Sequence, residues 1–251
     1  MMLRKEYVAQ FRRALVIAKK DIRIYYLKGP VIIFGVLIPL FLYLAFSIGR
    51  SIPINTLVAG LMAMTLFFTA TAVSPVIAPW ETTMRTLERL VSTPVSVSTI
   101  ILGDVIASLL FGILISVVPL VVGVVMGATV ASLPILVGGI ILAALCFSSL
   151  GGLLSTPPSS MPSTIMMLAS LLKFPLIFIS GIFIPLEQMP GWGQTLALFS
   201  PLTYFTDLAR YATQGIGYFP VYVDVAVLVL FTVIFFFAAV KLHNRNLPKR
   251  L

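Results

Sequence analysis

The sequence contains very few of the side chains that enzymes use for catalysis or for binding metal ions. Its one histidine, His243, lies in a basic tail where we expect it to be solvated, and its one cysteine, Cys146, lies inside an apolar run. A catalytic nucleophile needs an adjacent base, and a zinc site needs several such ligands. No lysine directly follows a glycine, so the phosphate-binding pattern G-x-x-x-x-G-K-S/T is absent. We therefore expect no catalytic residue, no metal site, no bound cofactor and no ATPase site in this chain.

Ionisable side chains are also rare within the apolar runs. Asp104 and Asp224 lie near the ends of two runs, from where a carboxylate can reach the membrane interface. A carrier driven by protons or sodium ions normally has such groups near the middle of the membrane, so that class is disfavoured. Lys173 is the one charge deep in a run, where a lysine costs roughly 2.5 to 3.5 kcal/mol. It lines a translocation path or a subunit contact, or it reaches a headgroup or a backbone carbonyl, and the sequence leaves both open.

These sparse polar groups belong to a chain with the overall composition of a membrane protein. Of its 251 residues, 59% are apolar and 10% are charged, whereas soluble domains have roughly 25% charged residues. The charged groups are too few to cover a soluble protein, and the many aromatic and branched residues exclude intrinsic disorder. We therefore predict an all-α, multi-pass membrane protein whose main surroundings are the lipid bilayer.

Six apolar segments are long enough to cross the hydrocarbon core, which takes about 20 residues in a helix. The predicted crossings are 30–49, 56–78, 100–126, 133–154, 164–185 and 221–240. Lysines and arginines concentrate before the first crossing, between the second and third, and after the sixth. The positive-inside rule therefore places both termini in the cytoplasm and the protein in the cell membrane. Topology accounts for the formal net charge of +9, so no nucleic-acid partner is needed.

Residues 1–29 are predicted to form a cytoplasmic amphipathic helix that lies in the membrane interface. An apolar stripe with alternating spacings of three and four consists of Val8, Phe11, Leu15, Ala18, Ile22 and Tyr25. Cations on the opposite face would lie near anionic headgroups. The helix serves as an anchor that fixes topology, and also as a lever packed beside the crossings. We thus divide the chain into this segment and a six-helix transmembrane domain, 30–251.

The loop between the second and third crossings is predicted to contain a short cytoplasmic helix, about 80–94. Glu81 and Arg85 stand four residues apart and Arg85 and Glu88 three apart, spacings that favour ion pairs on a helix. One side of this helix is apolar, and Pro94 ends it. A solvated loop helix is the simpler alternative, but the loop is longer than a short connection requires.

The stretch 186–220 is predicted to be an outer re-entrant region with one or two short helices before the last crossing. Its apolar part, 195–208, is too short to span the bilayer. Trp192 and Tyr204 are expected to anchor it at the membrane interface. Asp207 and Arg210 stand three residues apart, so we expect them to pair on one helix.

Both segments match motifs of one known family. The cytoplasmic motif, close to E-R-E-R-G-T-L-E-R-L and a T-P pair, is matched by Glu81, Thr86, Leu87, Glu88, Arg89, Leu90, Thr93 and Pro94, with Arg85 in place of its glycine. The outer motifs, near S-G-x-F-x-P, L/M-P-x-W and P-L-T-Y-x-x-D-x-x-R, are matched by Ser180, Gly181, Phe183, Pro185, Met189, Pro190, Trp192, Pro201, Leu202, Thr203, Tyr204, Asp207 and Arg210. The chain therefore resembles, over nearly its whole length, the permease subunits of ABC-2 type ABC transporters, which include drug and polysaccharide exporters.

The resemblance implies a division of work between this chain and its partners. The segment 80–94 would be the coupling helix that docks on a separate ATP-binding subunit through Glu81, Arg85, Leu87, Glu88, Arg89 and Leu90. Lys173, Phe183 and Pro185 would line the translocation path or a subunit interface, with Trp192, Tyr204, Asp207 and Arg210 in the outer region. Two ATP-binding subunits, which hold ATP and magnesium, would drive a permease dimer, expected to be a homodimer, usually in the export direction.

Two other classes of function remain as alternatives. The chain could be a self-sufficient ion-coupled carrier or channel, or it could be a membrane enzyme or a scaffold without transport activity. The lone histidine and the lack of paired carboxylates within the crossings speak against an enzyme. The transported substrate does not follow from the sequence.

Overall fold

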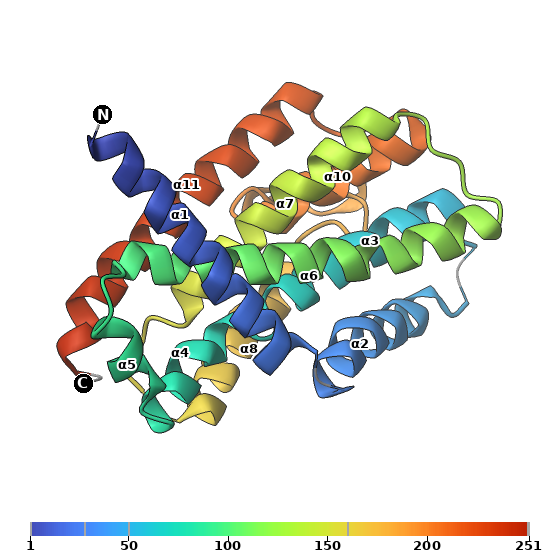
Figure 1. The fold of residues 1–251 in the computed structure, drawn as a ribbon. Helices are drawn as coiled ribbons and strands as arrows, with labels where there is room; N and C mark the ends of the chain where they lie inside the picture. The colour runs from blue at the N-terminus through green and yellow to red at the C-terminus, as the bar shows by residue number, and fades with distance from the viewer. Residues whose placement is uncertain (1, 28, 50, 160, 250–251) are drawn as a thin grey trace.

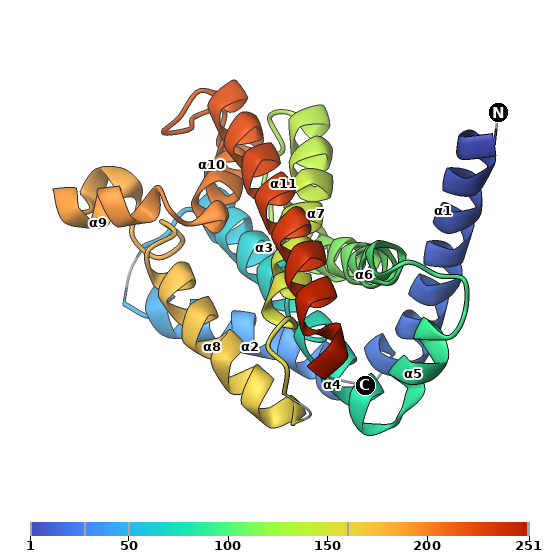
Figure 2. The same ribbon diagram turned by 90° about the vertical axis from the view of Figure 1, so that its left-hand side faces the viewer.

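The computed structural model describes residues 2–27, 29–49, 51–159 and 161–249, which form helices joined by turns (Figure 1). Over these ranges there is no strand, which confirms the all-α prediction. The long helices form a bundle, and α1 and α9 lie at opposite edges of it in Figure 2.

Four helical stretches are long and apolar enough to cross a membrane. They are Ile54–Thr83 with 30 residues, Val97–Val125 (α6) with 29, Leu133–Leu154 (α7) with 22 and Val221–Asn246 (α11) with 26. These stretches correspond to the second, third, fourth and sixth predicted crossings, so the chain is a multi-pass membrane protein. The last helix continues six residues beyond the predicted end at residue 240.

The first and fifth predicted crossings correspond to shorter apolar helices. α2 (Gly29–Ser47) contains the apolar stretch Gly35–Ala45, and α8 (Pro162–Phe178) has 17 residues. A helix needs about 20 residues to cross the hydrocarbon core, so helix length does not confirm a count of six crossings. The fifth crossing was predicted to reach residue 185, but the chain turns after Phe178 and reaches a positive φ of 79° at Gly181.

The second predicted crossing, 56–78, is broken about two thirds of the way along its length. α3 (Ile54–Ala70) ends, the chain turns over residues 71–73, and α4 (Ser74–Thr83) begins. Pro75 stands four residues after Thr71 and has no N–H, so it cannot donate the helical hydrogen bond that the Thr71 carbonyl would accept. The proline therefore explains the break and leaves a backbone carbonyl without a helical partner.

The main core lies where α3, α7, α10 (Pro201–Gln214) and α11 meet. Phe147 on α7 is fully buried, and its ring centroid lies 5.1 Å from that of Phe67 on α3 and 6.1 Å from that of Phe205 on α10. Both contacts are edge-on, an arrangement that aromatic rings favour. Cys146 is buried in the same core as a small apolar residue.

The N-terminal helix α1 (Met2–Asp21) and the π-helical turn Ile22–Tyr26 (η1) pack against α6. The two helices approach closely at Gly103, because a Cβ there would lie 2.6 Å from Ile17 Cγ2 and 3.0 Å from the Ala14 carbonyl oxygen. Glycine is therefore required at this crossing point.

Only part of the predicted apolar stripe of α1 is buried against the protein. Val8, Phe11 and Leu15 are 49%, 52% and 44% exposed, whereas Ala18 and Tyr25 are buried. The exposed part can meet a bilayer surface, and the buried part contacts the other helices. The predicted stripe is therefore divided between an exposed part and a part that packs against the protein.

Short elements connect these helices. α5 (Thr86–Val91) follows α4, η2 (Leu186–Gln188) and α9 (Gly191–Ala197) lie between α8 and α10, and η3 (Leu247–Lys249) follows α11. α9 and α10 fall in the region predicted to contain one or two short helices. His243, expected in a solvated tail, instead lies on α11 with its Nε2 3.1 Å from Ser155 Oγ, because α11 extends further than predicted.

Candidate functional site

Residues 81–96, called here the connecting segment, run from the last turn of α4 to the start of α6 and are not one helix as predicted. α4 ends at Thr83, Met84 and Arg85 form a turn, and α5 covers Thr86–Val91. Arg85 has φ 54° and ψ 24°, and it is the one described non-glycine residue with positive φ. This left-handed conformation ends the helix, and it falls at the position where the family motif has glycine.

Glu81, the first residue predicted for docking, points into the protein. It is 2% exposed, and its Oε1 accepts a hydrogen bond from Lys20 Nζ on α1. The predicted ion pair between Glu81 and Arg85 is absent among the described residues, because the turn at Arg85 breaks the helical register. Leu87 is also buried, with 6% of its surface exposed.

The other end of the connecting segment is also held by α1. Arg13 Nη1 donates a hydrogen bond to the Pro94 carbonyl oxygen, and Gln10 Nε2 lies 3.5 Å from the same atom. Gln10 Oε1 accepts a hydrogen bond of 2.7 Å from Thr99 Oγ1 at the start of α6. Lys20 and Arg13, two helical turns apart, thus fix the two ends of the segment to one face of α1.

The exposed side chains of the segment include Met84, Arg85, Glu88 and Arg89, called here the exposed set, as well as Thr83, Ser92, Thr93, Pro94 and Ser96, while Leu90 is half-buried. Of the six residues predicted to dock on a partner, Arg85, Glu88 and Arg89 are therefore exposed, and Glu81 and Leu87 support the segment from inside. The exposed set carries two cations, one anion and an apolar side chain, which suits a mixed polar contact with another protein.

A buried cluster of charges lies beneath this segment. Lys20 Nζ is 2.9 Å from Asp21 Oδ1 and also pairs with Glu81. Burial lowers the pKa of Lys20, but the Asp21 and Glu81 carboxylates raise it more, so the net shift is upward. Burial raises the pKa of Asp21, against the smaller opposing effects of Asp104 and Lys20. Lys20 is thus the one cation between two carboxyl groups, so the charge of both carboxylates is compensated only while Lys20 stays between them.

Asp104 was expected to reach the membrane interface but is only 8% exposed. Its carboxyl group interacts electrostatically with that of Asp21, which is fully buried. The contact with α1 therefore removes Asp104 from the surface, an effect that a local sequence pattern does not indicate.

In the outer region, Asp207 and Arg210 do not pair with each other as predicted. Asp207 accepts backbone N–H hydrogen bonds from Tyr218 at 2.8 Å and Phe219 at 2.7 Å. Arg210 Nη2 donates to the Gly181 carbonyl oxygen at 2.5 Å. Burial raises the pKa of Asp207, and the two amides oppose that effect. The two side chains attach α10 to two different loops.

The two predicted interface anchors differ in the structure. Trp192 is 71% exposed on α9, where it can meet the membrane interface. Tyr204 is 5% exposed, its hydroxyl donates to the Leu198 carbonyl oxygen at 2.9 Å, and its ring stacks on Phe219 at 5.6 Å. Tyr204 is therefore part of the core and not an anchor. Asp224, also expected at the interface, is instead fully buried.

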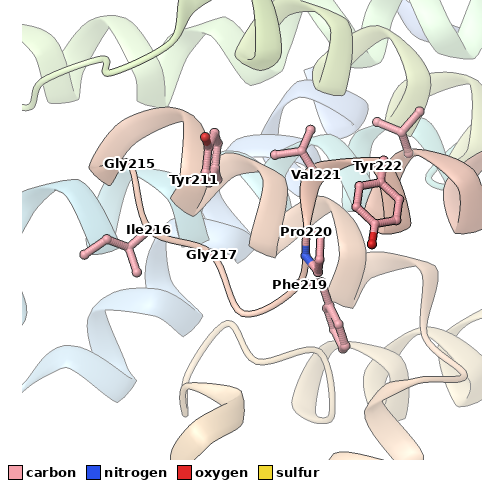
Figure 3. A pocket seen from close by; sticks show the side chains of 9 residues that line it. Tyr211, Gly215, Ile216, Gly217, Phe219, Pro220, Val221 and Tyr222 are labelled. Atoms are coloured by element: carbon pink, nitrogen blue, oxygen red, sulfur yellow. The ribbon is translucent and has the colours of Figure 1, made fainter.

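The loop between α10 and α11 borders a hollow of about 730 Å³ (Figure 3). Tyr211 on α10 and Tyr222 on α11 stand at its two sides, with Pro220 and Val221 between them (Figure 3). None of its nine lining residues is charged. The hollow therefore offers mainly apolar contacts, with the two tyrosine side chains at its sides.

The residues predicted for the translocation path lie on α8 and on the turn that follows it. Lys173 Nζ donates a hydrogen bond of 3.2 Å to the Thr71 carbonyl oxygen, the group that Pro75 leaves without a helical partner. The Phe183 ring centroid lies 6.2 Å from that of Tyr43 on α2, and Pro185 precedes η2. The structure thus brings Lys173 to the α3–α4 break and Phe183 to α2.

Sequence reasoning missed the two cations of α1 that hold the connecting segment. The amphipathic pattern predicts that the cations of this helix, which include Lys20 and Arg13, lie near anionic headgroups, because it separates apolar from charged positions but does not name a partner. One signal was available: Asp21 is one of only two acidic residues in the first 29, and it directly follows Lys20. This neighbouring pair marks two opposite charges close in sequence, but it does not identify Glu81 as the partner of Lys20.

Comparison with known proteins identifies relatives of this chain. The family model described as ABC-2 type transporter matches residues 12–213. The inner membrane transport permease YadH of Escherichia coli (strain K12) is 28% identical over 166 residues, which are 64% of this chain and 63% of that protein. Nodulation protein J of Rhizobium leguminosarum bv. trifolii is 34% identical over 108 residues, 43% of this chain and 41% of that protein. The chain thus spans less than two thirds of the length of these curated relatives.

Proposed function

The chain belongs to the ABC-2 type transporter family, and from that premise we propose that it is the permease subunit of an ATP-driven exporter. In this proposal two permease chains, expected to be identical, form the translocation path in the cell membrane. Two separate ATP-binding subunits hold ATP and magnesium in the cytoplasm, on the side where both termini of this chain lie.

The observation that carries the proposal is the attachment of both ends of the connecting segment to α1. Lys20 holds Glu81 at one end, and Arg13 holds the Pro94 carbonyl oxygen at the other. A force on the exposed residues Arg85, Glu88 and Arg89 would therefore move α1 and the segment together. These three residues are our candidates for the contact with the ATP-binding subunit.

The movement of α1 would reach the membrane helices through two routes. One is the close contact of α1 with α6 at Gly103, where the backbones have no space to slide freely. The other is α4, which joins the segment to the break beside Lys173. A nucleotide-dependent shift of the segment would thus bias the two arrangements of the path, in which we place Lys173, Phe183 and Pro185.

Copurification and crosslinking test this division of work. With Cys146 replaced by serine, the variant Glu88→Cys has a single exposed thiol on the connecting segment. We expect an ATP-binding subunit to copurify with this variant and to crosslink to the new thiol. The control Tyr222→Cys, at a position 75% exposed in the α10–α11 region, should not crosslink to it.

The same preparation separates the proposal from a self-sufficient carrier. Vesicles that contain the complex should hydrolyse ATP, and nucleotide should change the accessibility of the path. If the chain copurifies with no ATP-binding subunit and moves solutes by itself across liposomes, the proposal is wrong.

A further inference from the structure

A cavity of about 780 Å³ lies between five elements at the side of the bundle, one of which is α3 through Phe68. η1 and α2 border it on one side, α4 on another and α8 on a third. Its lining is mostly apolar and includes Tyr25, Val73, Trp80, Met166 and Phe174. Its size falls in the range of sites for drug-sized ligands.

One cation lines this apolar cavity. Lys173 Nζ donates one hydrogen bond to the Thr71 carbonyl oxygen and lies 5.9 Å from the centre of the Phe68 ring. An ammonium group has three donors, so two remain for a ligand. Within the described ranges of the chain, no carboxylate forms an ion pair with Lys173.

The position of this cation follows from the break between α3 and α4. Pro75 leaves the Thr71 carbonyl free, and Lys173 takes that hydrogen bond from the adjacent helix. A helix that is broken at membrane depth is tolerated where it lines a cavity, and its polar groups then face the cavity. The carbonyl fixes the ammonium in place but supplies only a partial negative charge.

We propose that this cavity binds an amphiphilic organic anion, with its acidic group on Lys173 and its apolar body against Trp80, Phe174 and Val73. Charge complementarity favours an anion over a neutral or cationic molecule of the same shape, because the lysine otherwise lacks a full counter-charge in an apolar site. The occupant is a free amphiphile that enters from the bilayer. This inference deepens the proposed transport role by naming the class of molecule that the path would take.

The two tryptophans of the chain permit a direct binding experiment. Trp80 lines the cavity, whereas Trp192 lies on α9 and is 71% exposed. The variant Trp192→Phe therefore reports the cavity alone, and Trp80→Phe reports non-specific partitioning into the membrane. Both are reconstituted in phosphatidylcholine vesicles and titrated with a brominated alkyl sulfonate, which quenches nearby tryptophan. The alcohol and the trimethylammonium compound of the same chain length are the comparison probes.

We expect the sulfonate to quench Trp80 in a saturable way, at a concentration about ten-fold lower than the alcohol needs, equivalent to about 1.4 kcal/mol. The trimethylammonium probe should show only the partitioning seen with the Trp80→Phe variant. In the Trp192→Phe background, Lys173→Met should abolish the preference for the sulfonate, and Lys173→Arg should retain it. The control Lys19→Met, which replaces an exposed lysine of α1, should also retain it.

Two results would overturn the site. One is equal quenching of Trp80 by the sulfonate and the alcohol, and the other is an unchanged sulfonate preference in a Lys173→Met protein with normal thermal stability. Vesicles with about one third phosphatidylglycerol then identify the occupant, with the sulfonate preference expected to persist. Its loss by competition would overturn the assignment to a free amphiphile and assign the cavity to a bilayer phospholipid. No step uses ATP, so failure here is distinct from failure of the proposed coupling to an ATP-binding subunit.

Discussion

Lys20 and Glu81, 61 residues apart in the sequence, form an ion pair between the N-terminal helix and the end of α4. Glu81 is 2% exposed, and the Lys20 side chain is 27% exposed. Lys20 also lies 2.9 Å from Asp21, so one cation compensates two carboxylates. The pair connects the amphipathic helix to the region that the family motif marks.

Replacing Lys20 with methionine should destabilise the protein, because it leaves the carboxyl groups of Asp21 and Glu81 without a cation. We expect a loss of about 2 to 3 kcal/mol in the free energy of unfolding, less than for a fully buried pair because Lys20 is partly solvated. Thermal unfolding in detergent micelles measures the change. Lys19→Met, which alters the exposed neighbour, should change stability little, and equal losses in both variants would contradict the internal role of Lys20.

The same pair should make stability depend on alkaline pH. The carboxylates raise the pKa of Lys20 above its ordinary value of 10.5, so the folded state holds this proton more tightly than the unfolded state. The stabilisation is complete below pH 10.5. It is lost as the pH rises through the higher pKa that Lys20 has in the folded state. Above that ordinary value, wild type should therefore lose more stability than Lys20→Met, as followed by chemical unfolding. Parallel curves for the two proteins would show that another group is responsible.

Arg85→Gly should stabilise the fold, because Arg85 has a left-handed φ of 54°. A residue with a side chain pays about 1 kcal/mol for this conformation, and glycine adopts it freely. We expect an increase of up to about 1 kcal/mol, since glycine also gains entropy in the unfolded chain. Arg89→Gly, which lies within α5, should instead lose about 1 kcal/mol. A lower unfolding temperature for Arg85→Gly would contradict the assigned backbone geometry.

Gly103→Ala should displace α1 from α6. The new methyl group would lie 2.6 Å from Ile17 Cγ2 and 3.0 Å from a backbone carbonyl of α1, and overpacking of this kind costs about 1 to 3 kcal/mol. Gly138→Ala on α7 is the matched control, because no atom outside its own helix lies within 4 Å of the added Cβ. Protease accessibility of residues 2–27 and the unfolding temperature report the change. Equal behaviour of the two variants would show that α1 does not pack closely at Gly103.

The apolar pattern of the sequence predicted the position of the helices well, but it did not predict their ends and breaks. Continuous apolar composition gives the extent of α7, 133–154, without correction, because nothing within it competes with helical hydrogen bonding. The α3–α4 break was missed although Pro75 lies within the predicted crossing. A proline in a membrane helix does not by itself specify a break, and here Lys173 of another helix accommodates it.

The predicted ion pairs failed for a common physical reason. Glu81 with Arg85, and Asp207 with Arg210, have spacings that favour pairing on a helix, but such exposed pairs contribute only a few tenths of a kcal/mol. Tertiary partners stabilise these side chains more strongly. Lys20 pairs with Glu81, and two backbone amides donate hydrogen bonds to Asp207. These partners lie far away in sequence or on the backbone, so spacing alone cannot identify them.

Glu88→Lys and Glu81→Lys distinguish a residue that contacts a partner from one that supports the segment. Glu88 is exposed on α5, so its reversal should change the unfolding free energy by less than about 0.5 kcal/mol. In the complex with its ATP-binding subunit, the same variant should uncouple ATP hydrolysis from movement of the path. Glu81→Lys instead places a second cation beside Lys20 in a buried site and should destabilise the chain by at least about 3 kcal/mol. Thermal unfolding of the isolated chain and ATPase coupling of the complex separate the two effects. Normal coupling in a folded Glu88→Lys complex would show that this residue is not part of the docking surface. An unchanged unfolding temperature for Glu81→Lys would contradict the attachment of α4 to α1. The proposed transmission of force depends on that attachment.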